Sequence, residues 1–261
     1  MKILVSNDDG IMADGLVTLV KRLSLEHEVY VAAPDRQRSA HSHSVTYFLR
    51  DLHAKMTEVP GACRAWAIDG TPADCVYAAV CGLMEEVPDL VVSGINKGWN
   101  VSYDCIYSGT VGAASEGTIL GIPSVAVSLA SDRPYEFETS AEITAQILKR
   151  FMEDPDRYEY VLNVNIPPLP KEEIKGIRPA KFDGRKMYGR KLDVNEENGV
   201  LSLHCPLIDV PVDDSTRTED GDITLVEEGF VTVSPIRLDW IDERYYGNAE
   251  LIAGLQISFI D

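Results

Sequence analysis

Short apolar runs alternate with segments of helical period along the first 167 residues of the chain. This pattern predicts strands at 3–6, 29–33, 90–93, 124–128 and 161–165. Between the first two strands, Leu16, Leu19, Val20 and Leu23 recur at helical spacing and share one face of a helix that packs on the sheet. Such alternation is typical of βαβ units. We therefore predict a Rossmann-like α/β fold with a mostly parallel sheet as the catalytic core, over 1–167.

Two further helices are expected within this region. The string Thr71-Pro72-Ala73-Asp74 combines a capping residue, a proline at the first helical position and an acid in the first turn. It therefore predicts a helix start. The second helix is expected over 139–151.

The pattern changes after Pro167, where short alternating runs replace the βαβ order. We expect antiparallel strands at 192–194, 200–204 and 230–233, with turns at 197–199 and 219–221. A short terminal helix is expected over 249–255. Residues 168–261 are thus predicted to be a β-rich, hairpin-containing extension of the same domain that belongs to an oligomer interface; a small appended sheet is the equally simple alternative.

Composition fits one sizeable α/β domain. The chain has 261 residues, of which 45% are hydrophobic, enough to bury a large core. No apolar run approaches the ~20 residues of a membrane span, and the start of the sequence lacks a basic stretch followed by a long apolar core. The five cysteines form no Cys-x-x-Cys pair. We therefore expect a cytoplasmic protein with reduced thiols, and no membrane partner.

The formal net charge is -18 and the pI is near 4.6. This acidity argues against a nucleic-acid polymer as partner, because affinity for a polyanion comes mostly from Lys and Arg on phosphates. A small phosphorylated substrate stays compatible if a bound cation reverses the local charge.

The first predicted strand leads directly into two adjacent carboxylates, Asp8 and Asp9, followed by Gly10. Ligands of open parallel sheets bind beyond the carboxyl ends of the strands, so this acidic pair is placed to hold a hard cation. An ordinary strand-to-helix turn is the alternative interpretation, since Asn, Asp and Gly are common turn residues.

Later strands also end in polar, glycine-bearing segments. The second strand is followed by a loop that contains Ser39, and the third by a segment that contains Asn96. Two Asp, one Ser and one Asn supply oxygen donors that suit one Mg²⁺ or Mn²⁺ ion better than zinc. Among the nearby cations, Arg36, Arg38 and Lys97 are candidate contacts for substrate phosphate; salt bridges or solvated charges are the alternatives.

A further string, Tyr107-Ser108-Gly109-Thr110-Val111-Gly112-Ala113-Ala114, combines hydroxyls and glycine with the start of a helix. Free backbone amides at a helix start, together with hydroxyls, form an anion site. On its own the string is typical of a capped helix that packs closely on a strand. Beside a metal site it predicts a phosphate cradle.

Five ordered motifs together resemble the survival protein SurE family, whose members are metal-dependent 5'-nucleotidases and phosphomonoesterases. These are Ser6-Asn7-Asp8-Asp9-Gly10-Ile11, Ala33-Pro34-Asp35-Arg36, Gly70-Thr71-Pro72-Ala73-Asp74-Cys75, Ser93-Gly94-Ile95-Asn96 and Tyr107-Ser108-Gly109-Thr110-Val111-Gly112-Ala113-Ala114. The match is dense over the first half of the chain and then thins. The resemblance implies a Rossmann-like core, and dimers or tetramers that exchange carboxyl-terminal segments.

The resemblance also implies roles for individual positions. The positions that match the family's metal ligands are Asp8, Asp9, Ser39 and Asn96, of which Asp8, Asp9 and Asn96 are the expected catalytic residues. The matches to the phosphate pocket are Ser108, Gly109 and Thr110, with Asn100 nearby and Lys97 as a further candidate. The implied reaction is hydrolysis of nucleoside 5'-monophosphates by metal-activated water, with 3'-monophosphates and polyphosphate as further candidate substrates.

The loop after Arg36 departs from the family pattern. The family commonly shows Asn-Gln-Ser-Gly, whereas this chain has Gln37-Arg38-Ser39-Ala40. Ala40 is unfavourable if the position requires positive φ. His41 and His43 follow; they are candidates for a second metal pair or for the general acid, with simple exposure as the favoured alternative.

Three rival functions share some of these features. A receiver-like signalling module also binds Mg²⁺ with adjacent acids, but it needs a phosphoacceptor Asp after a central strand, where this chain has Ser93-Gly94-Ile95-Asn96. A phosphatase with an aspartyl nucleophile needs Asp-x-Asp, and Asp8-Asp9-Gly10 lacks that spacing. A dinucleotide-binding protein ranks last, because the first turn has no Gly-x-Gly-x-x-Gly.

Overall fold

The computed structural model describes residues 1–130, 137–184, 192–204 and 217–239. Nine strands form the main sheet in the order β3-β4-β2-β1-β5-β6-β7-β11-β8. Their bounds are β1 Lys2–Ser6, β2 Glu28–Pro34, β3 Ala54–Thr57, β4 Arg64–Ile68, β5 Leu90–Lys97, β6 Ser124–Leu129, β7 Val161–Ile166, β8 Ile177–Pro179 and β11 Val231–Ile236. The six strands from β4 to β7 run parallel to one another, which confirms the predicted α/β fold with a mostly parallel sheet.

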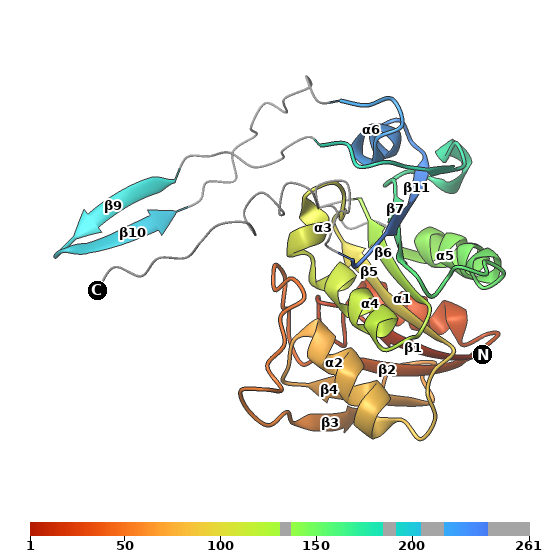
Figure 1. Ribbon diagram of the computed structural model, residues 1–261, viewed down its shortest axis with the longest axis horizontal. Helices are drawn as coiled ribbons and strands as arrows, with labels where there is room; N and C mark the ends of the chain where they lie inside the picture. Colours follow the sequence, from red (N-terminus) through yellow and green to blue (C-terminus); the bar gives the residue numbers. More distant parts are fainter. Residues whose placement is uncertain (131–136, 185–191, 205–216, 240–261) are drawn as a thin grey trace, which may run out of the picture.

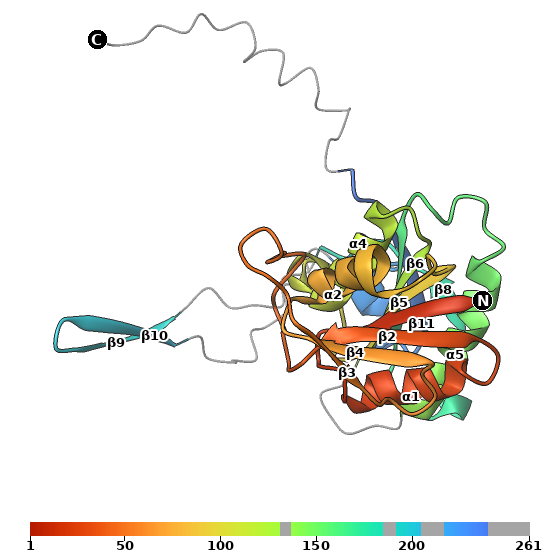
Figure 2. The same cartoon turned by 90° about the horizontal axis from the view of Figure 1, so that it is seen from below.

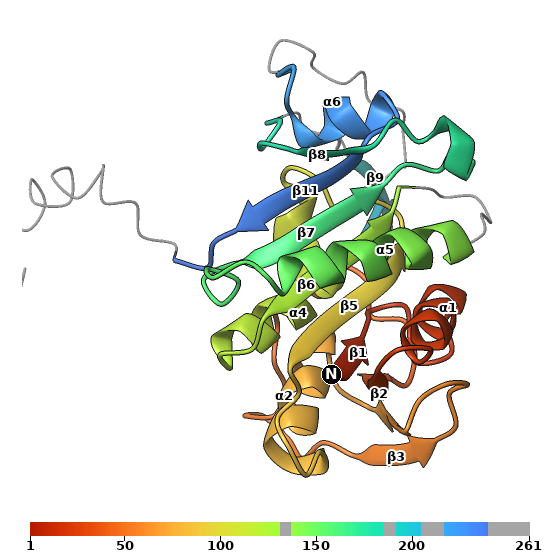
Figure 3. The same cartoon turned by 90° about the vertical axis from the view of Figure 1, so that its right-hand side faces the viewer.

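Helices cover both faces of this sheet (Figure 1, Figure 3). Helices α1 and α5 pack together on one face, and α2 and α4 pack together on the other. The helices are α1 Asp14–Leu23, α2 Pro72–Ala78 with its continuation Ala79–Leu83, α3 Asp104–Tyr107, α4 Gly109–Ile119, α5 Phe137–Phe151, the short turn Lys171–Glu173 and α6 Asp222–Glu227. The buried strands are mostly apolar on both sides, as expected of a sheet covered on two faces.

The local signals for two helices are borne out in detail. Leu16, Leu19, Val20 and Leu23 are fully buried on the inner face of α1. Thr71 and Asp74 form a reciprocal capping box at the start of α2, with Pro72 in the first turn.

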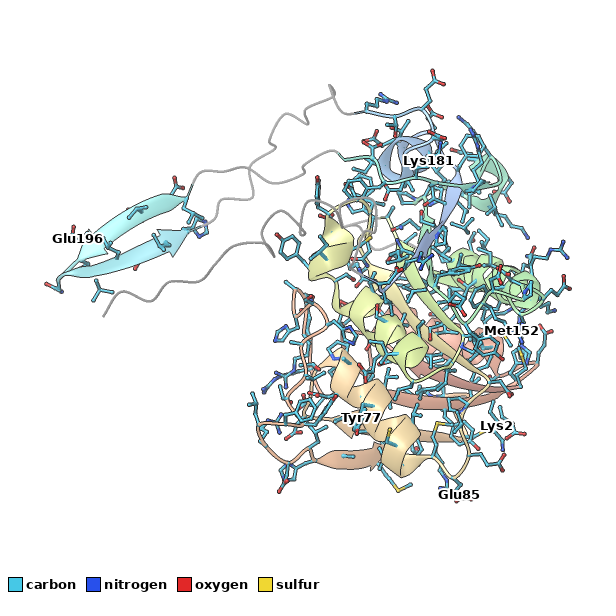
Figure 4. All side chains as sticks on the ribbon, in the orientation of Figure 1. Lys2, Tyr77, Glu85, Met152, Lys181 and Glu196 are labelled. Carbon is cyan, nitrogen blue, oxygen red and sulfur yellow. The ribbon has the colours of Figure 1, made fainter. Side chains whose placement is uncertain are left out.

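The described strands after Pro167 belong to two different sheets. Strand β11 pairs antiparallel with β7, and β8 pairs parallel with β11, so both extend the main sheet. Strands β9 Asp193–Glu197 and β10 Val200–His204 form a separate antiparallel hairpin. Its residues are all exposed, and it projects away from the body, as Figure 2 shows and as Glu196 marks in Figure 4.

Sequence reasoning erred at three points in the described chain. It missed β3 and β4, whose strands extend the sheet beyond β2. The turn predicted at 219–221 is present, since the N–H of Gly221 donates to the carbonyl of Thr218 at 3.1 Å, but the helix α6 that follows it was not predicted. That helix forms because Ile223, Leu225 and Val226 are buried and Asp222 accepts backbone hydrogen bonds. The helix expected over 249–255 lies outside the described residues.

Candidate active site

The carboxyl ends of β1 and β5 meet where the direction of strand addition reverses. From β1 the chain adds β2 and β4 on one side, and then β5 and β6 on the other. Open α/β sheets bind ligands at such a switch point. Asp8 and Asp9 follow β1, and Asn96 is the next-to-last residue of β5. The backbone N–H of Lys97 donates a 3.2 Å hydrogen bond to Oδ2 of Asp9, which joins the two strand ends.

Asp8 is buried at this end of the sheet, where helix α4 holds it. Its side chain is 4% exposed, and its Oδ1 accepts a 2.7 Å hydrogen bond from the hydroxyl of Thr110. A Cβ atom on Gly109 would lie 2.8 Å from Cβ of Asp8 and 3.0 Å from its Oδ2. Residue 109 must therefore be glycine for the helix start to approach the carboxylate this closely.

The electrostatics of the acidic pair follow from its burial. Burial raises the pKa of Asp8 to about 6; the Thr110 hydrogen bond opposes this shift and the Asp9 charge adds to it. Burial also raises the pKa of Asp9, against the hydrogen bond and positive charge of Lys97. Within the described residues neither carboxylate takes part in an ion pair of 4 Å or less. Two adjacent carboxylates without such a partner favour binding of a cation.

The loop that carries Ser39 lies against both Asp8 and α4. The N–H of Arg38 donates a 2.7 Å hydrogen bond to the carbonyl of Asp8. Ser42 bonds to the carbonyls of Tyr107 and Ile106 through its N–H (3.0 Å) and hydroxyl (2.6 Å). Ser39 itself is exposed, and its Oγ accepts a 3.0 Å bond from Nε2 of Gln37. The loop thus reaches the acidic pair from the side opposite β5.

The backbone of this loop has an unusual conformation at two positions. Ala40 has φ of +59° and Ser42 has φ of +55°. A non-glycine residue in this left-handed region costs about 1–2 kcal/mol. A glycine at this position, which the resemblance to the family implies, would avoid that cost, so Ala40 places strain in the loop.

The start of α4 has the form of an anion cradle. Ser108 is the N-cap, is buried, and accepts a 3.1 Å hydrogen bond from the N–H of Val111 through its hydroxyl. Gly109 and Thr110 form the first turn, where backbone N–H groups lack intrahelical partners. The hydroxyl of Thr110 donates its proton to Asp8, and the backbone N–H of Thr110 also faces that carboxylate. The hydroxyl of Ser108 accepts from Val111 and keeps its own proton. That hydroxyl and the backbone N–H of Gly109 are therefore the donors best placed for an anion.

Asn100 belongs to a buried amide network rather than to an open surface. Its Nδ2 donates to Oγ of Ser128 (2.7 Å), and its N–H donates to Oδ1 of Asn165 (2.8 Å). Its carbonyl accepts from the Nδ2 atoms of Asn163 and Asn165 at 2.8 and 2.9 Å. Sequence reasoning missed this network, although two asparagines inside the buried strand β7 are a usable signal.

The candidate cations lie in different settings. Lys97 is exposed at the end of β5, and its charge lowers the pKa of Asp9. Arg38 bonds to the carbonyl of Asp69 (3.1 Å) and to Asp35 (3.5 Å), which is a structural role. Arg36 is exposed. His41 is exposed with Nδ1 at 3.0 Å from the carbonyl of Ser39, whereas His43 is bonded to Glu116 on α4.

Asn96 has a fixed orientation. Its Nδ2 donates a 3.0 Å hydrogen bond to the carbonyl of Gly98. The described ranges hold no group of three or more His, Cys, Asp or Glu side chains with metal-binding geometry. A metal centre at this crevice must therefore combine the two carboxylates with neutral oxygen donors.

Comparison with known proteins places these features in a family. The family model for survival protein SurE matches residues 3–189. A protein of Synechococcus elongatus named 5'-nucleotidase SurE is 41% identical over 250 residues, which is 92% of this chain and 94% of that protein. A Proteus mirabilis protein named 5'/3'-nucleotidase SurE is 40% identical over 239 residues, covering 92% and 91%.

A solved structure has the same fold. The crystal structure of the SurE protein from Aquifex aeolicus superimposes with a TM-score of 0.80 at 34% identity, and the match covers 97% of this chain and 100% of that one. The likeness therefore extends over the whole fold and beyond the dense motifs of the first half.

Proposed function

The chain belongs to the survival protein SurE family, and on that premise we infer that it is a metal-dependent phosphomonoesterase that hydrolyses nucleoside 5'-monophosphates. The observation that supports this most strongly is the buried carboxylate of Asp8, held by Thr110 beside the helix start that forms the anion cradle. One crevice thus offers a site for a cation next to a site for a phosphate.

The residues at the crevice fit a single divalent ion with hard oxygen ligands. We assign the ligands as Asp8, Asp9, Ser39 and Asn96, with Mg²⁺ or Mn²⁺ as the ion. The donor set contains no sulfur or imidazole, and its two carboxylates carry charge that no nearby ion pair in the described chain balances. When bound, such an ion neutralises phosphoryl oxygens and activates water.

Asp8 and Asp9 have different tasks in this proposal. Oδ1 of Asp8 is already bonded to Thr110, so Asp8 serves as a fixed anchor. Asp9 is half-buried, and within the described residues its carboxylate accepts one hydrogen bond, from the Lys97 N–H. Its remaining acceptor positions are free to orient the attacking water and to take its proton, which its raised pKa favours.

The phosphoryl group binds at the start of α4. The backbone N–H of Gly109 and the hydroxyl of Ser108 donate to its oxygens, and the α4 dipole adds favourable charge. The side chain of Lys97, at the end of β5, is placed to pair with a phosphate oxygen on the exposed side. Asn100 acts indirectly: through its amide network it fixes the segment between β5 and α3.

The finer identity of the substrate and the assembly also belong to this proposal. Two relatives carry the name 5'/3'-nucleotidase, so 3'-monophosphates are included as candidate substrates, and polyphosphate is a further one.

We propose a homodimer or homotetramer in which 168–261 contributes to the interface. The cysteines in the described ranges are free thiols, which fits the reducing cytoplasm we propose as the compartment. No helix of the described ranges is long and apolar enough to cross a membrane.

One assay tests chemistry, cofactor and substrate class together. Phosphate release is measured from a panel of nucleoside 5'- and 3'-monophosphates with Mg²⁺, Mn²⁺ or a chelator. We expect release from the 5'-monophosphates that the chelator abolishes and the metal restores. Release that is insensitive to chelation contradicts the metal-dependent reaction.

A second experiment separates this reaction from the aspartyl-nucleophile and receiver alternatives. Enzyme is turned over with ³²P-labelled substrate, or incubated with a small phosphodonor, and then denatured with acid. Attack by water leaves no label on the protein, whereas an acyl phosphate on Asp8 or Asp9 retains it.

A further inference from the structure

The loop that carries Ser39 is joined to α4 by one polar contact between side chains. Nε2 of His43 lies 2.7 Å from Oε2 of Glu116. The side chain of Glu116 is 7% exposed, and that of His43 is 31% exposed. The two residues are 73 positions apart in sequence. The contact therefore links the loop after β2 to the C-terminal half of α4.

The surrounding contacts show that the loop rests directly on the helix. A Cβ on Gly112 would lie 2.5 Å from the carbonyl oxygen of Ser42 and 3.1 Å from Cα of His43. Gly112 therefore permits the close approach, and His43 reaches Glu116 one helical turn further along. The same helix holds Asp8 through Thr110. One helix thus contacts two of the three segments to which we assign metal ligands.

The loop needs such an anchor because its residues do not intrinsically favour the backbone conformation that they adopt. Ala40 and Ser42 both have positive φ, which disfavours this conformation in the free chain. On the other side of Ser39, the N–H of Arg38 donates a hydrogen bond to the carbonyl of Asp8. This bond brings Ser39 towards the acidic pair. If the contact between His43 and Glu116 is lost, the loop can move and so relieve the backbone strain at Ala40 and Ser42.

We propose that His43 and Glu116 form a positioning pair that clamps the Ser39 loop onto α4 and so sets the affinity of the site for its divalent ion. This inference rests on the proposed function, because it takes Ser39 as a ligand. Neither residue touches the reacting atoms. Outer partners of this kind typically change metal affinity by about 10- to 100-fold when they are removed.

The test measures Mn²⁺ binding to metal-free protein, by electron paramagnetic resonance of the free ion, for His43→Ala, Glu116→Ala and the double variant. We expect each single variant to bind Mn²⁺ about tenfold or more weakly, and the double variant to be no worse than either single one. His43→Gln, which retains a donor for Glu116, should restore much of the affinity. His204→Gln, in the exposed hairpin, serves as the matched control.

Hydrogen exchange supplies a second readout. The N–H groups of Arg38 and Ser42 should exchange faster in His43→Ala, while that of Cys75 in α2 should not change. Unchanged Mn²⁺ affinity in His43→Ala, or strictly additive losses in the double variant, would overturn the proposal even if thermal stability fell. Failure of the proposed function shows separately, as absence of nucleotidase activity in the wild-type protein with every metal.

Discussion

The hydroxyl of Thr110 donates a hydrogen bond of 2.7 Å to Oδ1 of Asp8, across 102 residues of sequence. This bond joins the first turn of α4 to the end of β1, and it fixes the relative position of the anion cradle and the acidic pair.

The pH dependence of stability should report on Asp8. Its pKa of about 6 in the folded protein exceeds its ordinary value of 3.8, so the folded state binds more protons between these values and stability falls as pH rises through this window. The cost above pH 6 is about 3 kcal/mol. Asp8→Asn should therefore be more stable than wild type in chelator at pH 7.5, with the difference shrinking below pH 6. Urea denaturation across this range measures it.

Bound metal should reverse the order of stability of the wild-type protein and Asp8→Asn. Wild-type protein should gain thermal stability with Mn²⁺, because the ion binds the folded state alone, whereas Asp8→Asn should gain little and lose nucleotidase activity. Equal stabilisation of the two proteins by Mn²⁺ would contradict the assignment of Asp8 as a ligand.

Adding a methyl group at residue 109 should displace Asp8. In Gly109→Ala the new Cβ meets Cβ of Asp8 at 2.8 Å, so the carboxylate must shift away from the position it needs for catalysis. We expect phosphate release to fall by about 100-fold with a far-ultraviolet circular dichroism spectrum like that of wild type. Gly82→Ala is the control, since nothing lies within 4 Å of its new Cβ; it should keep full activity.

Restoring glycine at position 40 should relieve backbone strain. Ala40→Gly removes the cost of positive φ and should raise the free energy of unfolding by about 1 kcal/mol, net of the greater freedom of glycine in the unfolded chain. The same exchange inside a helix, Ala145→Gly in α5, should lower it by about 1 kcal/mol. Urea denaturation of both variants measures the two changes in the free energy of unfolding. A loss of stability in Ala40→Gly would contradict the inference that Ala40 is strained.

Asp74 should prove important for stability although it lies in a motif shared with the family. Its buried carboxylate accepts from the N–H groups of Thr71 and Thr46 at 2.8 Å and from the hydroxyl of Thr46 at 2.6 Å. Asp74→Ala leaves these donors without partners and should cost about 3 kcal/mol or more. Thr46→Val, which removes only one hydroxyl, should cost about 1 kcal/mol. Similar costs for the two variants would argue against this role.

Local patterns were sufficient wherever a residue's environment follows from its neighbours in sequence. The periodicity of Leu16 to Leu23 identified the buried face of α1, and Thr71 to Asp74 identified the start of α2. The strands β1, β2, β5, β6 and β7 were each predicted within a few residues. The edge strand β3, its neighbour β4 and helix α6 were not, because their stability comes from packing against distant elements rather than from a strong pattern of their own.

The sequence by itself determined the fold class and the polar residues that follow each parallel strand, because strand alternation and chain direction place those residues at one edge of the sheet. Only the tertiary structure decided their partners: Thr110 bonds to Asp8, Asn100 to the asparagines of β7, and His43 to Glu116. These pairings join residues 63 to 102 positions apart. No local preference encodes such contacts; they arise when helices dock on the sheet and buried polar groups must find partners.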